Sequence, residues 1–183
     1  MMKIQTTSIR YSSFSIGLHW FMLFLLAAVY ASMEFRGIFP KGSEGRSALK
    51  TWHYMLGLSV FAAVGVRLLV NLVATAPGIT PTPPRWQTLA STWVHAALYL
   101  LMIGMPLAGW LLLSAEGEAI PFFGLQLPAL IAENEARAEI IKEVHETGAV
   151  VGYFLNGLHA AAALCHHYVV RDKTLRRMLP WRA

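Results

Sequence analysis

The sequence predicts an all-α integral membrane protein, a four-helix bundle that forms a single domain over residues 1–183. Two observations support this prediction. Of the 183 residues, 56% are hydrophobic and 14% are charged, and the mean hydropathy is +0.49, which is too apolar for an ordinary soluble domain. The apolar residues also gather in four segments. Each segment is long enough to cross a bilayer as a helix, which takes about 20 residues.

The first apolar segment covers residues 13–33 and follows the basic residues Lys3 and Arg10. Signal peptides share this arrangement. However, His19 lies inside the segment, and an ionisable side chain would be out of place in a segment that is removed. We therefore expect residues 13–33 to stay in the protein as its first helix.

The second and third apolar segments cover residues 52–73 and 86–114. Trp52 and Trp86 stand at their starts, where an indole ring prefers the boundary between head groups and hydrocarbon. The links before these segments are rich in residues that end helices, namely Pro40, Gly42 and Gly45 in one and Pro77, Pro81, Pro83 and Pro84 in the other. Each segment is therefore expected to form a separate helix.

The fourth apolar segment covers residues 144–170 and follows a longer link, residues 115–143. This link contains the apolar stretch IPFFGLQLPAL and then the acidic stretch EARAEIIKEVHE. We expect it to form a lid over the bundle, with a short amphipathic helix lying on the surface.

The charge pattern favours membrane lipid over nucleic acid as a partner. The net charge is +5, but the basic residues flank apolar segments rather than forming one basic face, so membrane lipid with anionic head groups is the expected partner. Basic residues predominate beyond the segment ends that share a side with both termini: Lys3, Arg10, Arg85, Arg171, Lys173, Arg176, Arg177 and Arg182. This side is predicted to be cytoplasmic.

The histidines supply the strongest functional signal. His145 and His159 are fourteen residues apart in the fourth segment, so in a helix they share nearly the same face and stand about 21 Å apart along the axis. His53 lies level with His145, and His19 lies level with His159. Two pairs of imidazoles at two depths fit two low-spin haems, each with two axial histidines.

The predicted iron ligands are therefore His53 and His145 for an outer b haem and His19 and His159 for an inner one. His95 lies at a similar depth to the inner pair, and it remains an alternative to His19 or His159. Zinc would require clustered ligands, and the neighbouring Cys165, His166 and His167 point in different directions on a helix.

Arg67 follows His53 by fourteen residues, which places it on the same helix face near the inner haem. A haem propionate is a natural partner for an intramembrane guanidinium. The alternative is that Arg67 extends to the lipid head groups.

Several stretches of the sequence resemble the bacterial cytochrome b-561 family, specifically its superoxide oxidase type. They are MEFRGIFP from Met33, WHYMLG around His53, HETGAVVGYFLNGLHAAAALCHHY from His145 and DKTLRRMLP from Asp172. The histidine spacing alone is also similar to that of the membrane cytochrome subunits of formate dehydrogenases and hydrogenases. The GLHAAAALCHHY and MEFRG stretches are more discriminating.

The resemblance implies a diheme protein of the bacterial inner membrane that passes electrons from superoxide, outside, to ubiquinone, inside. It implies the same four haem ligands and places His166 at the quinone site, where we expect it to relay protons. A cationic rim of Arg36, Lys41, Arg46, Lys50 and Lys142 is expected to attract superoxide. The alternative function is that of an electron-transfer subunit that links a partner dehydrogenase to the quinone pool.

Overall fold

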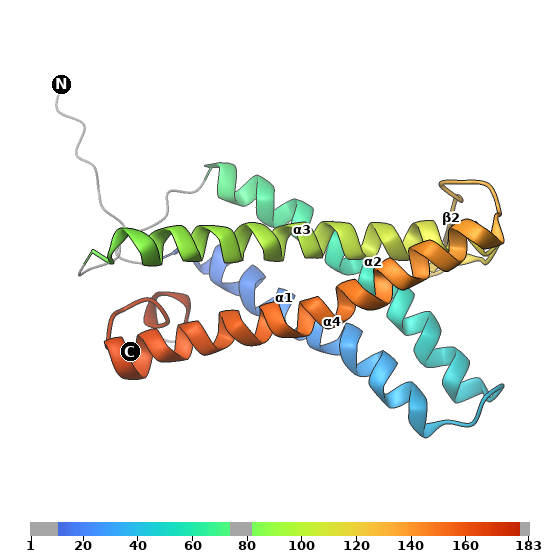
Figure 1. Ribbon diagram of the computed structural model, residues 1–183, viewed down its shortest axis with the longest axis horizontal. Coiled ribbons are helices and arrows are strands. Elements are labelled where there is room, and N and C mark those ends of the chain that lie inside the picture. Colours follow the sequence, from blue (N-terminus) through green and yellow to red (C-terminus); the bar gives the residue numbers. More distant parts are fainter. Residues whose placement is uncertain (1–10, 74–81, 180–183) are drawn as a thin grey trace.

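Four long helices form the structure, a computed structural model that describes residues 11–73 and 82–179 (Figure 1). They are α1 (Ser13–Phe35), α2 (Glu44–Val73), α3 (Arg85–Ala115) and α4 (Glu135–Cys165). Each helix is long and apolar enough to cross a membrane. The predicted all-α class with four spanning helices is confirmed.

The helices run back and forth, so the two ends of the bundle differ. The start of α1 and the end of α4 lie together at one end, which we call the terminal end (Figure 1). The links between α1 and α2 and between α3 and α4 lie at the other, which we call the hairpin end. Lys3, Arg10, Arg182 and the link residues Pro77 and Pro81 lie outside the described residues. The cytoplasmic location of the terminal end stays a prediction.

Two helices begin well before their apolar segments. Helix α2 begins at Glu44 rather than at Trp52, after Ser43, whose hydroxyl accepts a hydrogen bond from the Arg46 N–H. Helix α4 begins at Glu135, after Asn134, whose side chain accepts a hydrogen bond from the Arg137 N–H. A side-chain cap satisfies the free N–H groups of a first turn. Charged turns can therefore extend a spanning helix beyond the hydrocarbon.

The prediction of a separate lid helix is wrong. The acidic stretch EARAEIIKEVHE forms the first turns of α4 instead of a separate surface helix, because the Asn134 cap starts a helix that continues without a break into the apolar segment. The apolar stretch before it forms an antiparallel hairpin of β1 (Ile120–Phe122) and β2 (Leu125–Leu127). Gly124, with a φ of 86°, occupies the turn, where a left-handed backbone favours glycine.

The helices pack in two pairs, α1 against α2 and α3 against α4, and α2 also packs against α3. Their shared core lies near the middle of the bundle and consists of Met22, Leu25, Val60, Ala63, Val64, Leu98 and Met102. A second, smaller cluster joins Leu58, Leu113 and Ile120, so the hairpin is packed onto α2 and α3. These contacts hold the helices that carry the histidines.

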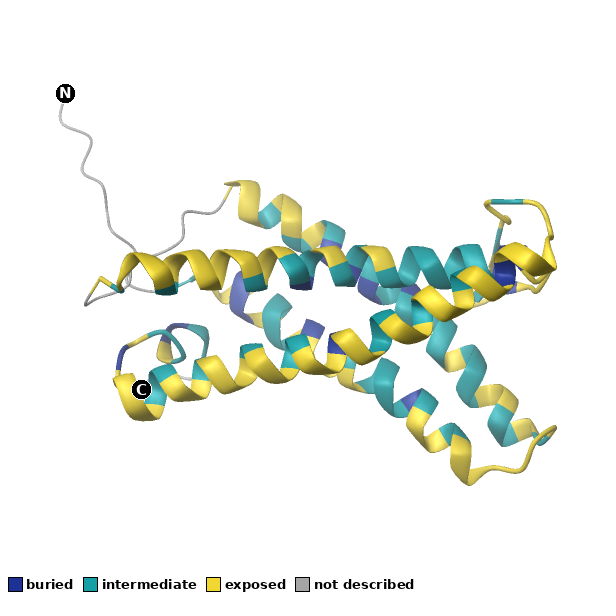
Figure 2. Ribbon diagram, viewed as in Figure 1, coloured by how far each residue is buried: buried dark blue, intermediate teal, exposed yellow. Residues whose placement is uncertain are grey.

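The outward faces of the helices are largely apolar. Exposed segments run along all four helices (Figure 2), and large apolar side chains such as Phe24, Leu69, Leu100 and Phe154 are 66–75% exposed. Such surface is unfavourable in water and suits contact with lipid tails. The outward faces therefore agree with four membrane-spanning helices.

Candidate functional site

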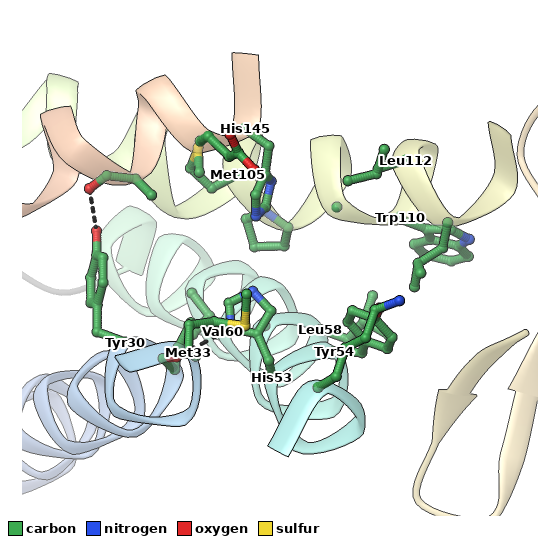
Figure 3. Close-up of a pocket in the computed structure, with 18 of the residues that line it drawn as sticks. Tyr30, Met33, His53, Tyr54, Leu58, Val60, Met105, Trp110, Leu112 and His145 are labelled. Atoms are coloured by element: carbon green, nitrogen blue, oxygen red, sulfur yellow. Dashed lines mark hydrogen bonds between the residues drawn. The ribbon is translucent and has the colours of Figure 1, made fainter. Parts of the chain in front are cut away.

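The first histidine pair lies toward the hairpin end. His53 of α2 and His145 of α4 face one another across a cavity (Figure 3). Their ring centroids are 6.2 Å apart and the ring planes meet at 83°. A metal–imidazole bond is about 2 Å long and the ring centre lies roughly 1 Å behind the nitrogen, so imidazoles on opposite sides of one ion have centres about 6 Å apart. The spacing therefore fits two axial ligands of one iron.

A backbone carbonyl orients His53. Its Nδ1 atom lies 3.1 Å from the Val29 carbonyl oxygen and 3.3 Å from the Ser32 hydroxyl. The Ser32 hydroxyl lies 2.6 Å from the same carbonyl and donates to it. Because a carbonyl only accepts, Nδ1 is expected to carry the proton, which leaves the lone pair of Nε2 available to a metal. This is the usual support for a metal-binding histidine.

The cavity between the two rings has a volume of about 420 Å³. All four helices and the hairpin contribute to its lining, which is mostly apolar and includes Val60, Leu101, Met102, Met105, Pro106 and Leu113. Three cations also line it, Arg36, Lys50 and Lys142. An apolar cavity with facing imidazoles and nearby cations fits the chemistry of a flat apolar cofactor with acidic side groups.

The residues around this cavity include a glycine that sequence reasoning missed. A Cβ atom built on Gly109 of α3 would lie 3.3 Å from Cε1 of His145. The missing side chain thus leaves room for the imidazole. A glycine within an apolar helix was a usable signal, because small residues mark close approach between spanning helices.

Two tyrosines line the cavity, Tyr30 of α1 and Tyr153 of α4. The rings of Tyr30 and Tyr153 pack with centroids 4.1 Å apart. Tyr30 donates a hydrogen bond to the Ala149 carbonyl (3.2 Å), and Tyr153 donates one to Glu34 (2.8 Å). They tie α1 to α4 between the two histidine pairs. Sequence reasoning did not single out either residue.

The second histidine pair lies toward the terminal end. His19 of α1 and His159 of α4 have ring centroids 6.3 Å apart, with an angle of 66° between the planes. This separation matches that of the first pair. Helix α4 thus supplies one histidine to each site, and the two histidines stand about 21 Å apart along its axis.

His95 of α3 also lies beside the second pair. Its ring centroid is 5.3 Å from that of His159, about 1 Å shorter than the separation expected for two imidazoles on opposite sides of one iron. The distances therefore favour His19 as the partner of His159. His95 fits better as a polar neighbour of the site.

Arg67 of α2 is near the second pair. Its guanidinium interacts electrostatically with His19, His95 and His159, and its Nε–H donates to the Tyr99 hydroxyl at 3.1 Å. Its position agrees with the region in which a propionate partner was expected. That role stays a prediction.

Of the five cations that were predicted to form a rim, three line the cavity. They are Arg36, Lys50 and Lys142. Arg46 instead donates hydrogen bonds to the carbonyls of Arg36 and Phe39. Lys50 lies 3.5 Å from Glu118, and three further glutamates, Glu34, Glu116 and Glu146, line the cavity. Positive and negative groups therefore line the same cavity.

His166 lies in the π-helical turn that ends α4, His166–Val170. Its Nδ1 atom is 2.6 Å from Oδ2 of Asp172. Burial alone would raise the pKa of Asp172, but the Thr174 N–H and the His166 imidazole donate to the carboxylate and hold that pKa below its usual value. Asp172 is therefore ionised at neutral pH.

The described residues offer no alternative metal centre. Over 11–73 and 82–179, no group of three or more His, Cys, Asp or Glu side chains could hold a metal ion. Cys165 is exposed. Two imidazoles alone make a poor zinc site but a complete axial set for haem iron, whose remaining ligands come from the porphyrin.

Comparison with known proteins agrees with this chemistry. A family model described as prokaryotic cytochrome b561 matches residues 10–181. Cytochrome b561 homolog 1 of Escherichia coli K12 is 40% identical over 173 residues, covering 94% of this chain and 98% of that protein. The probable superoxide oxidase CybB of Yersinia pestis is 35% identical over 171 residues, covering 93% and 96%. Cytochrome b561 homolog 2 of E. coli K12 is 28% identical over 186 residues, covering 97% and 95%.

Proposed function

The chain belongs to the prokaryotic cytochrome b561 family of electron-transfer membrane proteins, and we propose that it oxidises superoxide and reduces ubiquinone across the bacterial inner membrane. In this function it binds two b haems. The hairpin end faces the periplasm and receives superoxide. The terminal end faces the cytoplasm and binds ubiquinone.

The arrangement of two facing histidine pairs along one helix is the main support for the proposal. His53 and His145 are 6.2 Å apart at one level, and His19 and His159 are 6.3 Å apart at the other. Sites at two levels of one bundle provide a path for electrons across a membrane. Storage of haem would not need such a path. The relative from Yersinia pestis, named a probable superoxide oxidase, favours superoxide as the donor.

The reaction requires electron transfer and proton uptake but no nucleophile. Haem b, when bound, supplies one-electron redox chemistry. The paired histidines would hold the haems and would leave no open position on the iron for a substrate. Each superoxide loses one electron and becomes dioxygen, while ubiquinone gains two electrons and two protons and becomes quinol. His166, at the terminal end, is the proposed proton donor to the quinone.

Neutralising the cavity cations tests whether superoxide enters at the hairpin end. The variant R36Q/K50Q/K142Q is expected to slow haem reduction by superoxide about tenfold at low salt, because it removes the three cations that offset the three glutamates of the cavity and leaves a lining that repels a small anion. The difference should shrink at high salt, since salt screens exposed charges. Stopped-flow rates over a series of salt concentrations measure both effects.

The matched control for this experiment is K41Q, because Lys41 is an exposed cation of the same end that does not line the cavity. It should behave as the wild type. Haem content is measured for each variant, so that loss of cofactor is not mistaken for loss of attraction. Equal rates for the triple variant and the wild type at every salt concentration would remove steering from the mechanism.

Replacing His166 with alanine is expected to slow quinone reduction and leave haem content unchanged. General acid catalysis by a positioned side chain contributes about 10²- to 10⁴-fold, and water can replace part of it, so we expect a loss of at least about tenfold. The measurement is the rate at which quinone reoxidises the reduced haems. His167→Ala is the adjacent control. Loss of haem in H166A would make His166 a ligand instead.

A further inference from the structure

Asp172 is unusual among the acidic residues. It is the only aspartate in the chain, and the nine glutamates all lie between positions 34 and 146, in the helix ends and links of the hairpin end. The terminal end thus has one acidic side chain among many basic residues. A carboxylate in such surroundings has many possible cationic partners. Asp172 nevertheless points at a histidine.

The contact between Asp172 and His166 is built into the end of α4. The Asp172 N–H donates to the His166 carbonyl at 3.1 Å, and Arg171, with a φ of 60°, turns the chain back in a left-handed conformation. This reversal brings Oδ2 of Asp172 to 2.6 Å from Nδ1 of His166. The other carboxylate oxygen, Oδ1, accepts the Thr174 N–H at 2.8 Å. Both oxygens are therefore engaged, and the carboxylate has a fixed orientation.

The segment that carries Asp172 is also attached to α1. The indole N–H of Trp20 donates to the Met178 carbonyl at 2.6 Å, and the Trp20 ring lies 5.9 Å from that of His19. The Asp172 side chain is 5% exposed and that of His166 is 26% exposed. The carboxylate is thus shielded from water beneath a histidine that remains accessible.

These contacts determine which nitrogen of His166 can exchange a proton. An ionised carboxylate only accepts hydrogen bonds, so Nδ1 carries a proton and donates it to Asp172. In neutral His166, the lone pair therefore lies on Nε2. When Nε2 is protonated as well, the negative carboxylate stabilises the resulting imidazolium. An acid group that orients a catalytic histidine in this way recurs in unrelated enzymes.

We propose that Asp172 is a positioning residue for quinone reduction, which fixes His166 as the Nδ1–H tautomer so that Nε2 delivers protons to the quinone. This inference rests on the proposed function. In each delivery the N–H bond at Nε2 breaks, an O–H bond forms at a quinone carbonyl oxygen, and Nε2 then regains a proton from water at the terminal end. The electrons arrive from superoxide, and Asp172 stays ionised.

The variant D172N tests this role with little change of shape. If the carbonyl oxygen of the introduced amide keeps the Thr174 N–H, the NH₂ group of that amide faces Nδ1 of His166 and donates to it. The His166 proton must then move to Nε2, and the imidazolium loses its stabilising charge. We expect ¹⁵N NMR of histidine-labelled, dithionite-reduced protein to show this change of tautomer. H166N identifies the His166 signals by their absence.

Kinetics provide the second measurement. D172N is expected to slow haem reoxidation by a soluble ubiquinone analogue about 10- to 100-fold at saturating quinone, the range typical when a metal-binding histidine loses the group that orients it. The quinone concentration for half-maximal rate should stay within about twofold of the wild type, because Asp172 does not contact the substrate. D172E retains the charge and should recover part of the rate. H167N is the adjacent control and should preserve the His166 tautomer.

The outcomes separate this inference from the function on which it rests. If wild-type haems are reduced by superoxide but never reoxidised by quinone, the proposed function is wrong. If reoxidation occurs and H166A slows it, but D172N reoxidises at the wild-type rate, only the role of Asp172 is overturned. A loss of haem in D172N that D172E does not reverse would make Asp172 a structural residue, which also overturns the inference.

Discussion

Replacing His53 with alanine is expected to remove one of the two proposed haems and leave the other in place. His53 and His145 face one another at 6.2 Å, and the Val29 carbonyl oxygen 3.1 Å from Nδ1 of His53 leaves its Nε2 for iron. Without His53, the cavity of about 420 Å³ would keep one histidine to hold a haem instead of two. The haem-to-protein ratio should fall from about two to about one.

The pyridine haemochrome assay of purified protein measures this ratio. H145A should give the same loss, because either histidine completes the same pair. H167A is the control for a histidine outside both pairs and should retain both haems. Retention of both haems in H53A and H145A alike would exclude this pair as ligands. Loss of both haems would mean that the bundle needs the first to bind the second.

The second large effect distinguishes His19 from His95. H19A is expected to lose the haem of the terminal end, whereas H95A is expected to keep it. The reason is geometric, because the centroid of His159 lies 6.3 Å from that of His19 and 5.3 Å from that of His95. The longer separation is the one that matches the about 6 Å expected for two rings on opposite sides of an iron. H159A should resemble H19A.

The same assay, with absorbance spectra of the reduced protein, decides between these histidines. In H19A the remaining haem should be the one that H53A removes, and a H19A/H53A double variant should contain no haem. H95A serves as the matched control, since it removes an imidazole from the same region. Loss of the terminal-end haem in H95A, with retention in H19A, would assign the ligand to α3 instead of α1.

The four spanning helices could be predicted from the sequence because lipid imposes a simple requirement. A segment in hydrocarbon must satisfy its backbone hydrogen bonds within itself, so a long apolar run must be helical. The same argument says little about residues in water. The first turns of α2 and α4 are charged, and their helical state depends on caps at Ser43 and Asn134. The short hairpin was missed because it also lies outside the spanning segments, where the requirement imposed by lipid does not apply.

The depths of the histidines and two pairings could also be predicted, whereas the place of His95 could not. Spacing along a helix fixes depth and face, and this was enough to propose His53 with His145. It left His95 open, because three helices bring histidines to the same level at the terminal end. Only the ring positions distinguish a separation of 6.3 Å from one of 5.3 Å.

The contact between His166 and Asp172 was beyond the reach of sequence reasoning. It depends on a chain reversal at Arg171, a residue that gives no sign of a left-handed backbone. Six positions separate the two residues, and a continued helix would place them on different faces. Gly109 was only partly hidden, because a glycine in an apolar helix indicates close approach but does not say which side chain of another helix comes close.

In the proposed function, superoxide gives electrons to this protein and ubiquinone takes them away. Stopped-flow measurement of haem absorbance, after mixing purified protein with superoxide, tests it most directly. We predict rapid haem reduction, followed by reoxidation only when a soluble ubiquinone analogue is present. Haems that dithionite reduces but superoxide does not would contradict this function, and would point to a partner dehydrogenase as the electron donor.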